Sequence, residues 1–303
     1  MGKRNNQYLL IVEKNNWVNM PLYINNKPRF VNKNKIISNN SELVLKSQDN
    51  IEIYSEFYPE YKTVYDAFTT KPDDDTVLAQ ETMVKSLDEN GVWDKLDALW
   101  VFAGHTNDDG ESQINWKNPG TYDATLSNSP SFSAFSGFLT NGTTSYIRTN
   151  WIPSDGVNYS LYSASAFVYS TWSETSPGFD LGATSGYGLQ IAPDLGTDDR
   201  WATSIHGNVW REYHYSNYGF YHISRTSSSS ISFYRNGSLL QTNNSNSAVA
   251  EPSVQVYIGC QNNNNSPSLF SEKRYACAGV GGAMNSTEVS NLYSAILTYM
   301  NAT

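Results

Sequence analysis

One short segment, Ile231–Leu240, constrains the fold of this chain more than any other; it reads ISFYRNGSLL. At its centre, Asn236-Gly237 is a dipeptide that supplies the two positive-φ residues of a type I′ turn, whose twist matches that of its flanking strands. Before the turn, apolar and polar side chains alternate, so Ile231 and Phe233 share one face of a strand. The segment therefore predicts an antiparallel β-hairpin.

Segments of similar character recur from Tyr122 to the end of the chain, and each is bounded by Gly, Asn, Ser, Asp or Pro. They are Ser145–Arg148, Ser165–Tyr169, Gly188–Ile191, Gly219–Ile223 and Val254–Gly259. Many short, regularly spaced strands without helices between them are typical of an antiparallel sandwich. The sequence therefore predicts a mainly β protein.

Three stretches carry a resemblance to a known fold. The hairpin comes near the end of the strand array, Phe138–Ile147 looks like an opening strand, and Arg274–Met284, followed by a short helix, looks like a closing strand. Together they resemble laminin-G-like, concanavalin A-type jelly rolls. The resemblance implies a C-terminal concanavalin A-like antiparallel jelly-roll sandwich, and it says little about a ligand because jelly rolls host many functions.

Within that superfamily, the chain is similar to a group found in structural proteins of tailed bacteriophages. The similarity covers roughly residues 64 to 303 and includes Ala67–Pro72 and Gly91–Trp100. It implies a fibre or decoration protein of the virion, assembled in the host cytoplasm. Such proteins are usually homo-oligomers, most often trimers, so the expected partners are further copies of the chain and other virion proteins.

Charge divides the chain and supports three regions. Net charge is +2 over residues 1–60, −8 over 61–112 and −3 over 113–303. We expect a small β attachment domain at 1–60, a linker and acidic helical connector at 61–111, and a jelly roll with a C-terminal helix at 112–303. The strands expected in the first region are Tyr8–Val12, Trp17–Ile24, Arg29–Val31, Lys35–Ile37, Leu43–Leu45 and Ile51–Tyr54.

Helices are predicted at three places. Thr76–Asp88 has an apolar stripe and follows an aspartate triplet that suits a helix N-terminus. Val92–Trp100 has apolar residues at three- and four-residue spacing, and a last helix begins at Asn285 or Ser286 with Glu288 completing a capping box. The second of these carries more apolar surface than a short helix needs, which predicts an oligomer interface at Trp93, Leu96, Leu99 and Trp100.

Several classes of protein are disfavoured. A net charge of −9 argues against general nucleic-acid binding. No apolar run approaches the ~20 residues of a membrane span, and the brief run Tyr8–Val12 does not predict a secretion signal. Cys260 and Cys277 are too few for a disulfide scaffold and are expected to be buried thiols, although a bridge between them stays open.

No constellation of catalytic or metal-binding residues emerges. The Glu-x-Asp-x-Glu pattern of jelly-roll glucanases is missing, and His206, His214 and His222 recur every eight residues without further ligands nearby. A loop with Asp194, Asp198 and Asp199 could hold calcium, but its spacing matches no known motif. The sequence thus predicts no catalytic residue, no metal, no cofactor and a protein that is not an enzyme.

The best candidate for binding is an aromatic run in which amides and charges are interleaved. Flat C–H faces of sugars stack on aromatic rings, and amide side chains take their hydroxyls. The predicted carbohydrate-binding residues are Trp210, Tyr213, His214, Tyr215, Asn217 and Tyr218. We therefore expect a virion protein that displays a jelly roll to a cell-surface or mucosal glycan. The alternatives are a divergent glycoside hydrolase that acts on a host polysaccharide and a purely structural decoration protein without a ligand.

Overall fold

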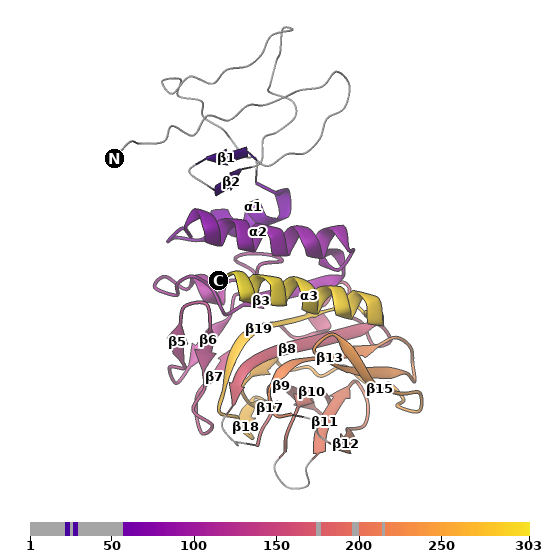
Figure 1. Ribbon diagram of the computed structural model, residues 1–303. Coiled ribbons are helices and arrows are strands. Elements are labelled where there is room, and N and C mark those ends of the chain that lie inside the picture. Colours follow the sequence, from indigo (N-terminus) through magenta and orange to yellow (C-terminus); the bar gives the residue numbers. More distant parts are fainter. Residues whose placement is uncertain (1–21, 25–26, 30–56, 174–176, 196–199, 214–215) are drawn as a thin grey trace, which may run out of the picture. The chain divides into compact units, whose positions relative to one another are not determined.

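The chain divides into two compact units, Met1–Pro59 and Glu60–Thr303. The computed structural model describes residues 22–24, 27–29 and 57–303, apart from 174–176, 196–199 and 214–215 (Figure 1). In the first unit, β1 (Leu22–Ile24) pairs antiparallel with β2 (Lys27–Arg29). The other strands that the sequence predicts before residue 57 lie outside the described residues.

The second unit is a sandwich of two sheets. In the nine-stranded sheet the order is β12-β11-β10-β9-β16-β7-β4, with β17 paired to β9 and to β18. Its pairs are antiparallel except for the short contact between β17 and β9. The strands are β4 (Thr125–Ser127), β7 (Tyr146–Arg148), β9 (Leu181–Ser185), β10 (Tyr187–Ala192), β11 (Arg200–Ile205), β12 (Trp210–Tyr213), β16 (Tyr257–Ile258), β17 (Gln261–Asn263) and β18 (Ser266–Ser268).

The eight-stranded sheet has the order β15-β14-β13-β8-β19-β6-β5, and β3 also pairs with β19. All of its pairs are antiparallel. The strands are β3 (Leu96–Val101), β5 (Ser131–Ser133), β6 (Gly137–Leu139), β8 (Ala164–Ser173), β13 (Gly219–Arg225), β14 (Ile231–Arg235), β15 (Ser238–Asn243) and β19 (Lys273–Gly281). This architecture confirms the predicted mainly β sandwich.

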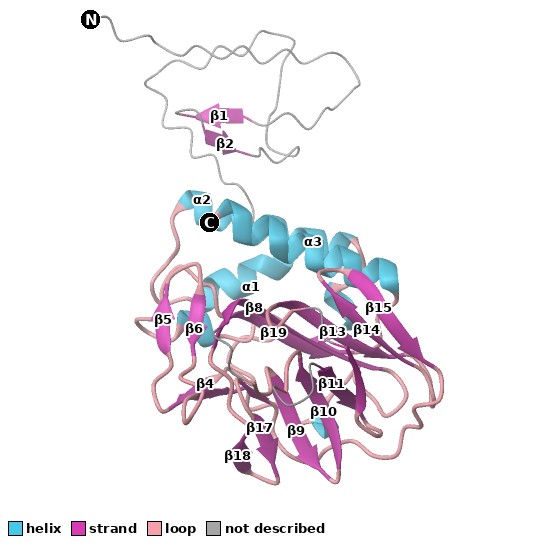
Figure 2. Cartoon of the chain, turned by 60° about the horizontal axis from the view of Figure 1, so that its bottom comes forward, coloured by secondary structure: helices cyan, strands magenta, loops and turns pink. Residues whose placement is uncertain are grey.

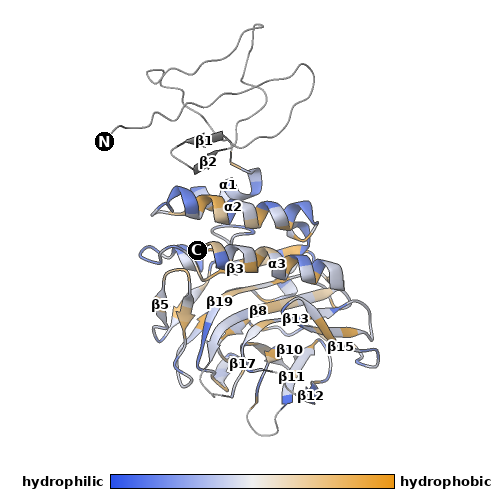
Figure 3. Cartoon of the chain, viewed as in Figure 1, coloured by the Kyte–Doolittle hydropathy of each residue, from blue (hydrophilic) through white to orange (hydrophobic). Residues whose placement is uncertain are grey.

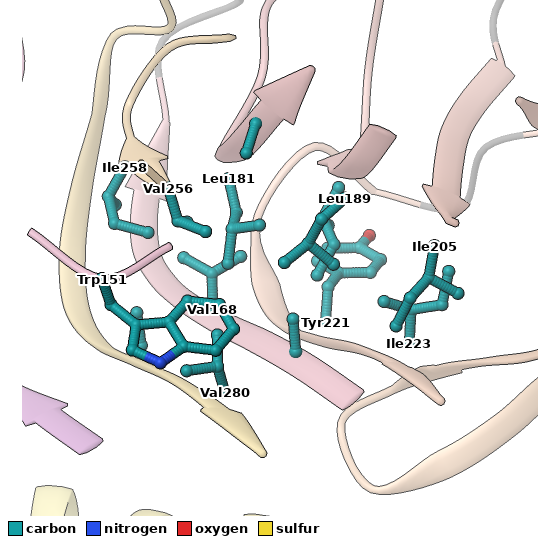
Figure 4. Packing of buried hydrophobic residues seen from close by; sticks show 14 of the residues in the cluster. Trp151, Val168, Leu181, Leu189, Ile205, Tyr221, Ile223, Val256, Ile258 and Val280 are labelled. Carbon is teal, nitrogen blue, oxygen red and sulfur yellow. The ribbon is translucent and has the colours of Figure 1, made fainter. Parts of the chain in front are cut away.

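The main core lies between the two sheets. Alternate residues of facing strands point inward, so that Val168 and Ile223 of one sheet meet Leu181 and Leu189 of the other (Figure 4). Trp151 closes one side of this core and is fully buried. Burial of this much apolar surface is the main stabilising contribution to the unit.

Helices cover the other face of the eight-stranded sheet, which makes a third layer (Figures 1 and 2). The helices are α1 (Pro59–Ala67), α2 (Asp74–Glu89) and α3 (Ser286–Ala302). The ring of Tyr293 on α3 lies 5.4 Å from that of Phe220 on β13, and the Tyr299 hydroxyl donates to the carbonyl of Ala103 at 2.7 Å. Apolar and polar residues alternate around α2 and α3 (Figure 3), as expected for helices with one buried face.

Local signals for helix ends and turns are confirmed. The Asp73 carboxylate accepts from the Thr76 amide and caps α2, while Asn285 and Glu288 form the predicted capping box of α3. Asn236 and Gly237 both have positive φ, at 48° and 76°, as a type I′ turn requires. A register shift between Phe233 and Tyr234 adds a bulge that the sequence does not predict.

The predicted helix at 92–100 is wrong. A 3-10 turn at Trp93–Lys95 leads directly into β3, which pairs with β19. This strand is buried on both faces because one faces the core and the other the helices, so its apolar residues are nearly continuous and imitate helical spacing. The sandwich therefore begins before residue 112, and the acidic helical segment belongs to the same compact unit.

The same strand removes the basis for the predicted oligomer interface. The four side chains that suggested it are at most 5% exposed within a single chain. They are Trp93, Leu96, Leu99 and Trp100. Oligomerisation itself stays a prediction. No helix in the described part of the chain combines the length and the apolar character of a membrane span.

Candidate functional site at the loop end of the sandwich

The predicted binding residues follow one connection that crosses between the two sheets. It leaves β12, at the edge of the nine-stranded sheet, and enters β13, in the eight-stranded sheet. Such crossings lie at an end of a sandwich, where loops meet solvent and carry function. His214 and Tyr215, in the middle of the connection, lie outside the described residues.

Trp210 points into the sandwich. It is 8% exposed, and its ring meets that of Trp201 edge-to-face at a centroid distance of 4.9 Å. Its Nε1 donates to the Glu212 carboxylate at 3.4 Å. Trp201 in turn lies 4.4 Å from Phe233 of the opposite sheet. The Trp210 ring is therefore part of the core, and it anchors β12, the strand from which the crossing leaves.

Asn217 and Tyr218, which lie nearer to β13, are more accessible than Trp210. Tyr213 ends β12, opposite Arg200 in register. Asn217 is half-buried, and Tyr218 is 47% exposed just before β13 begins. The structure thus brings Asn217 and Tyr218 to one end of the sandwich and separates Trp210 from them by burial.

A second exposed ring lies beside this crossing, and sequence reasoning missed it. Trp172 on β8 is 40% exposed. The pairing of β8 with β13 ends at Ser170 and Gly219, so Trp172 and Tyr218 both lie just past it, at the same end of adjoining strands. The pairing of β8 with β19 shifts register between Ser170 and Trp172, which interrupts the alternation of β8 at this end. Beyond Ser170, β8 also has no partner in β13, and the Trp172 ring is exposed there. We call Trp172, Asn217, Tyr218, Tyr221 and Arg235 the loop-end site.

Tyr221 and Arg235 are the two residues of the loop-end site that lie on paired strands. They lie opposite each other on β13 and β14, and the guanidinium is 6.0 Å from the centre of the Tyr221 ring. The Tyr221 hydroxyl donates to the carbonyl of Ser216, which ties the crossing to β13. Burial raises the pKa of Tyr221, so this hydroxyl stays neutral and keeps its proton. The site offers two rings, one amide and one cation to a ligand.

Asp180 and Glu212, two of the described acidic residues near this end, have side-chain partners. Asp180 is fully buried against Lys273, and Glu212 accepts the hydrogen bond of Trp210. Asp194 lies in an isolated bridge with Gly178, while Asp198 and Asp199 lie outside the described residues. Among the residues that the structure describes, no three His, Cys, Asp or Glu side chains gather as a metal site.

His206, His222 and both cysteines are buried. His206 is buried between the Tyr159 hydroxyl at 2.7 Å and the carbonyl of Leu161 at 2.9 Å, and His222 lies under the helical layer. Cys260 and Cys277 are buried and free. Burial raises the pKa of both thiols, so neither is an activated nucleophile.

Comparison with known proteins gives structural matches only. No family model matches the chain, and no curated protein matches it. Among solved structures, a mutant sialidase of Trypanosoma rangeli matches with a TM-score of 0.48 and 14% identity over 73% of this chain. The T. rangeli sialidase bound to sialic acid matches with a TM-score of 0.46 and 14% identity over 72% of this chain. Domain 4 of AbnA, a GH43 extracellular arabinanase from Geobacillus stearothermophilus bound to arabinotriose, matches with a TM-score of 0.44 and 16% identity.

The coverage differs between these matches. The alignment spans 39% and 38% of the two sialidase chains, but 98% of the arabinanase domain and 65% of this chain. The prediction that the protein is not an enzyme is contradicted by these matches, since they are named as sialidases and an arabinanase, and it is not retained. None of the three is named as a phage protein.

Proposed function

We propose that this protein binds carbohydrate at the loop-end site. The observation that carries the proposal is the pair of exposed rings, Trp172 and Tyr218, at the same end of adjoining strands. Large aromatic rings at a surface present apolar faces for the C–H faces of a sugar and a polar edge for its hydroxyls. Asn217 adds an amide that both donates and accepts hydrogen bonds.

The expected affinity of one site is modest. Stacking of one ring contributes on the order of 1 kcal/mol, and each 1.4 kcal/mol is about tenfold in the dissociation constant. Two rings and a few hydrogen bonds therefore give weak binding at a single site. Presentation of several copies would raise the apparent affinity through avidity.

A glycan array probed with the full chain tests this proposal, followed by calorimetry on the best glycan. Trp172→Ala and Tyr218→Ala should each weaken binding about five- to tenfold, because each removes one stacking face. Tyr162→Ala is the matched control, since Tyr162 is 53% exposed and precedes the start of β8, away from Trp172. Unchanged binding in the first two variants, or an equal loss of binding in Tyr162→Ala, would show that the glycan does not bind at the loop-end site.

The same samples distinguish binding from hydrolysis. Reducing sugar released from the bound glycan would support the hydrolase alternative. Glu212 and Asp194 would then be the first carboxylates to replace, because both lie on elements that lead into this end of the sandwich. Binding of the glycan without release of reducing sugar would support a protein that recognises carbohydrate and does not hydrolyse it.

The biological setting that we propose is the virion of a tailed bacteriophage. Its support is the sequence resemblance to structural proteins of tailed bacteriophages, which covers roughly residues 64 to 303 and includes Ala67–Pro72 and Gly91–Trp100. In this proposal residues 1–60 attach the chain to other virion proteins, and the chain forms a homo-oligomer, with a trimer favoured. Peptide mass spectrometry of purified particles and sedimentation of the full chain test the two parts. Particles without the protein, or a monomer at micromolar concentration, would contradict them.

A further inference from the structure

An ion pair lies wholly inside the sandwich. Asp180, just before β9 of the nine-stranded sheet, and Lys273, the first residue of β19 in the eight-stranded sheet, are both completely buried. Lys273 Nζ lies 2.7 Å from Asp180 Oδ1. The pair therefore connects the two sheets through side chains that are 93 positions apart in the chain.

Hydroxyl groups surround the carboxyl group but not the amine. Asp180 accepts from the Tyr275 hydroxyl at 3.2 Å and from Ser170 Oγ at 3.4 Å. Among the described residues, Lys273 Nζ has no acceptor other than Asp180. An ammonium group carries three donors, so two of them would be buried without partners, which is costly.

The same burial favours the uncharged form of the Asp180 carboxyl group. Burial raises the pKa of Asp180, and the opposing effect of Lys273 does not cancel it. Amide formation uses the neutral acid and the neutral amine, which differ from the ion pair only by one proton moved from Nζ to the carboxylate. A neutral amine held against a neutral carboxylic acid is a reactive pair.

We propose that Asp180 and Lys273 become joined by an amide bond between Cγ and Nζ. The lone pair of Nζ attacks Cγ, the C–N bond forms, and one Cγ–O bond breaks. One amine proton goes to the departing hydroxyl, so one water molecule leaves and no oxidant or reductant is needed. The Tyr275 hydroxyl donates to Oδ1, where negative charge develops during attack. The product nitrogen carries one hydrogen instead of three.

A second ion pair of the same length provides an internal contrast. Lys95 Nζ lies 2.7 Å from Glu288 Oε2, but these side chains are 36% and 19% exposed. Water reaches that pair, stabilises its charges and allows the side chains to move. Of these two pairs, only the one between Asp180 and Lys273 combines close approach with full burial. Groups held close together in a packed interior can react faster by several orders of magnitude.

Mass spectrometry of the denatured full chain tests the proposal. The expected mass is that of the sequence minus one water molecule. Trypsin should then yield residues 149–200 and 236–274 as one joined species, because the modified Lys273 is not cleaved. Peptides that contain Lys95 and Glu288 should appear separately, as the matched control.

Two variants locate the bond. Asp180→Ala and Lys273→Met should each have the full mass of their own sequence, whether or not they fold. A wild-type chain with its full sequence mass and with separate peptides 149–200 and 236–273 would overturn the proposal. Loss of water that persists in either variant would overturn it as well, because the dehydration would then lie elsewhere.

Discussion

The imidazole of His222 is fully buried beneath the helical layer, and within the described residues neither ring nitrogen has a hydrogen-bond partner. The rings of Phe167, Phe220 and Tyr234 surround it, at centroid distances of 6.2, 6.4 and 5.6 Å. Burial lowers the pKa of His222 from 6.5 to about 3. Between pH 6.5 and about 3, the imidazole is therefore neutral in the folded protein but protonated in the unfolded chain.

This histidine should make the free energy of unfolding depend on pH. Because the folded pKa is depressed, its contribution is complete above pH 6.5 and is lost as pH falls toward 3, at up to about 1.4 kcal/mol per pH unit. His206, whose burial lowers its pKa to about 4, adds in the same direction. Urea unfolding of His222→Leu at pH 7, 6 and 5 should show a shallower decline than wild type.

Phe220→Leu is the control for that measurement, since it changes the same ring cluster without removing a titratable group. It should lower stability at every pH and keep the slope of the wild type. Equal slopes in wild type and His222→Leu would show that the imidazole stays neutral in both states or is solvated in the folded one.

At the scale of elements, some local signals were sufficient to predict structure and others were not. The hairpin turn at Asn236-Gly237 and the caps of α2 and α3 depend on backbone conformation and on side chains within a few residues, so the sequence predicts them. The segment of β3 was predicted as a helix because its nearly continuous apolar residues imitate helical spacing. Its burial on both faces, which explains those residues, depends on layers formed by distant parts of the chain. The exposure of Trp172 was missed for a related reason, since it depends on where the partner strand ends.

The capping box of α3 supports a prediction at this scale. The Asn285 side chain accepts from the amides of Thr287 and Glu288, and Glu288 also pairs with Lys95. Asn285→Ala should lower the free energy of unfolding by about 1 kcal/mol, because two amides at the helix start lose their acceptor. Asn285→Asp keeps an acceptor and should change stability far less in thermal or urea unfolding. Equal losses in both variants would argue against capping as the cause.

At the scale of the whole molecule, β19 is the strand on which the eight-stranded sheet depends. It pairs with β8 on one side and with β3 and β6 on the other. Its long partner β3 comes from the segment that the sequence assigned to a connector. The sequence predicted a sandwich correctly from strand spacing but not this pairing, because nothing local indicates which distant strands meet.

The position of β3 predicts the result of truncation. A fragment of residues 60–303 contains a whole compact unit and should unfold cooperatively. A fragment of residues 112–303, which the sequence suggested as the jelly roll, lacks β3, α1 and α2, so one side of β19 and the face of α3 that packs on α2 are exposed. It should show a broad transition or aggregate in differential scanning calorimetry. A sharp transition at the temperature of the longer fragment would contradict this.

The order of pairing has a consequence for synthesis of the protein. The strand that completes the eight-stranded sheet, β19, comes after the other seven strands of that sheet in the chain, so it leaves the ribosome after all of them. Until then β3 and β8 lack a shared neighbour, and closing such distant pairings is slow. A nascent chain would carry an unpaired sheet edge and an uncovered apolar face until β19 emerges. Such exposed surfaces are the ones that chaperones protect from aggregation.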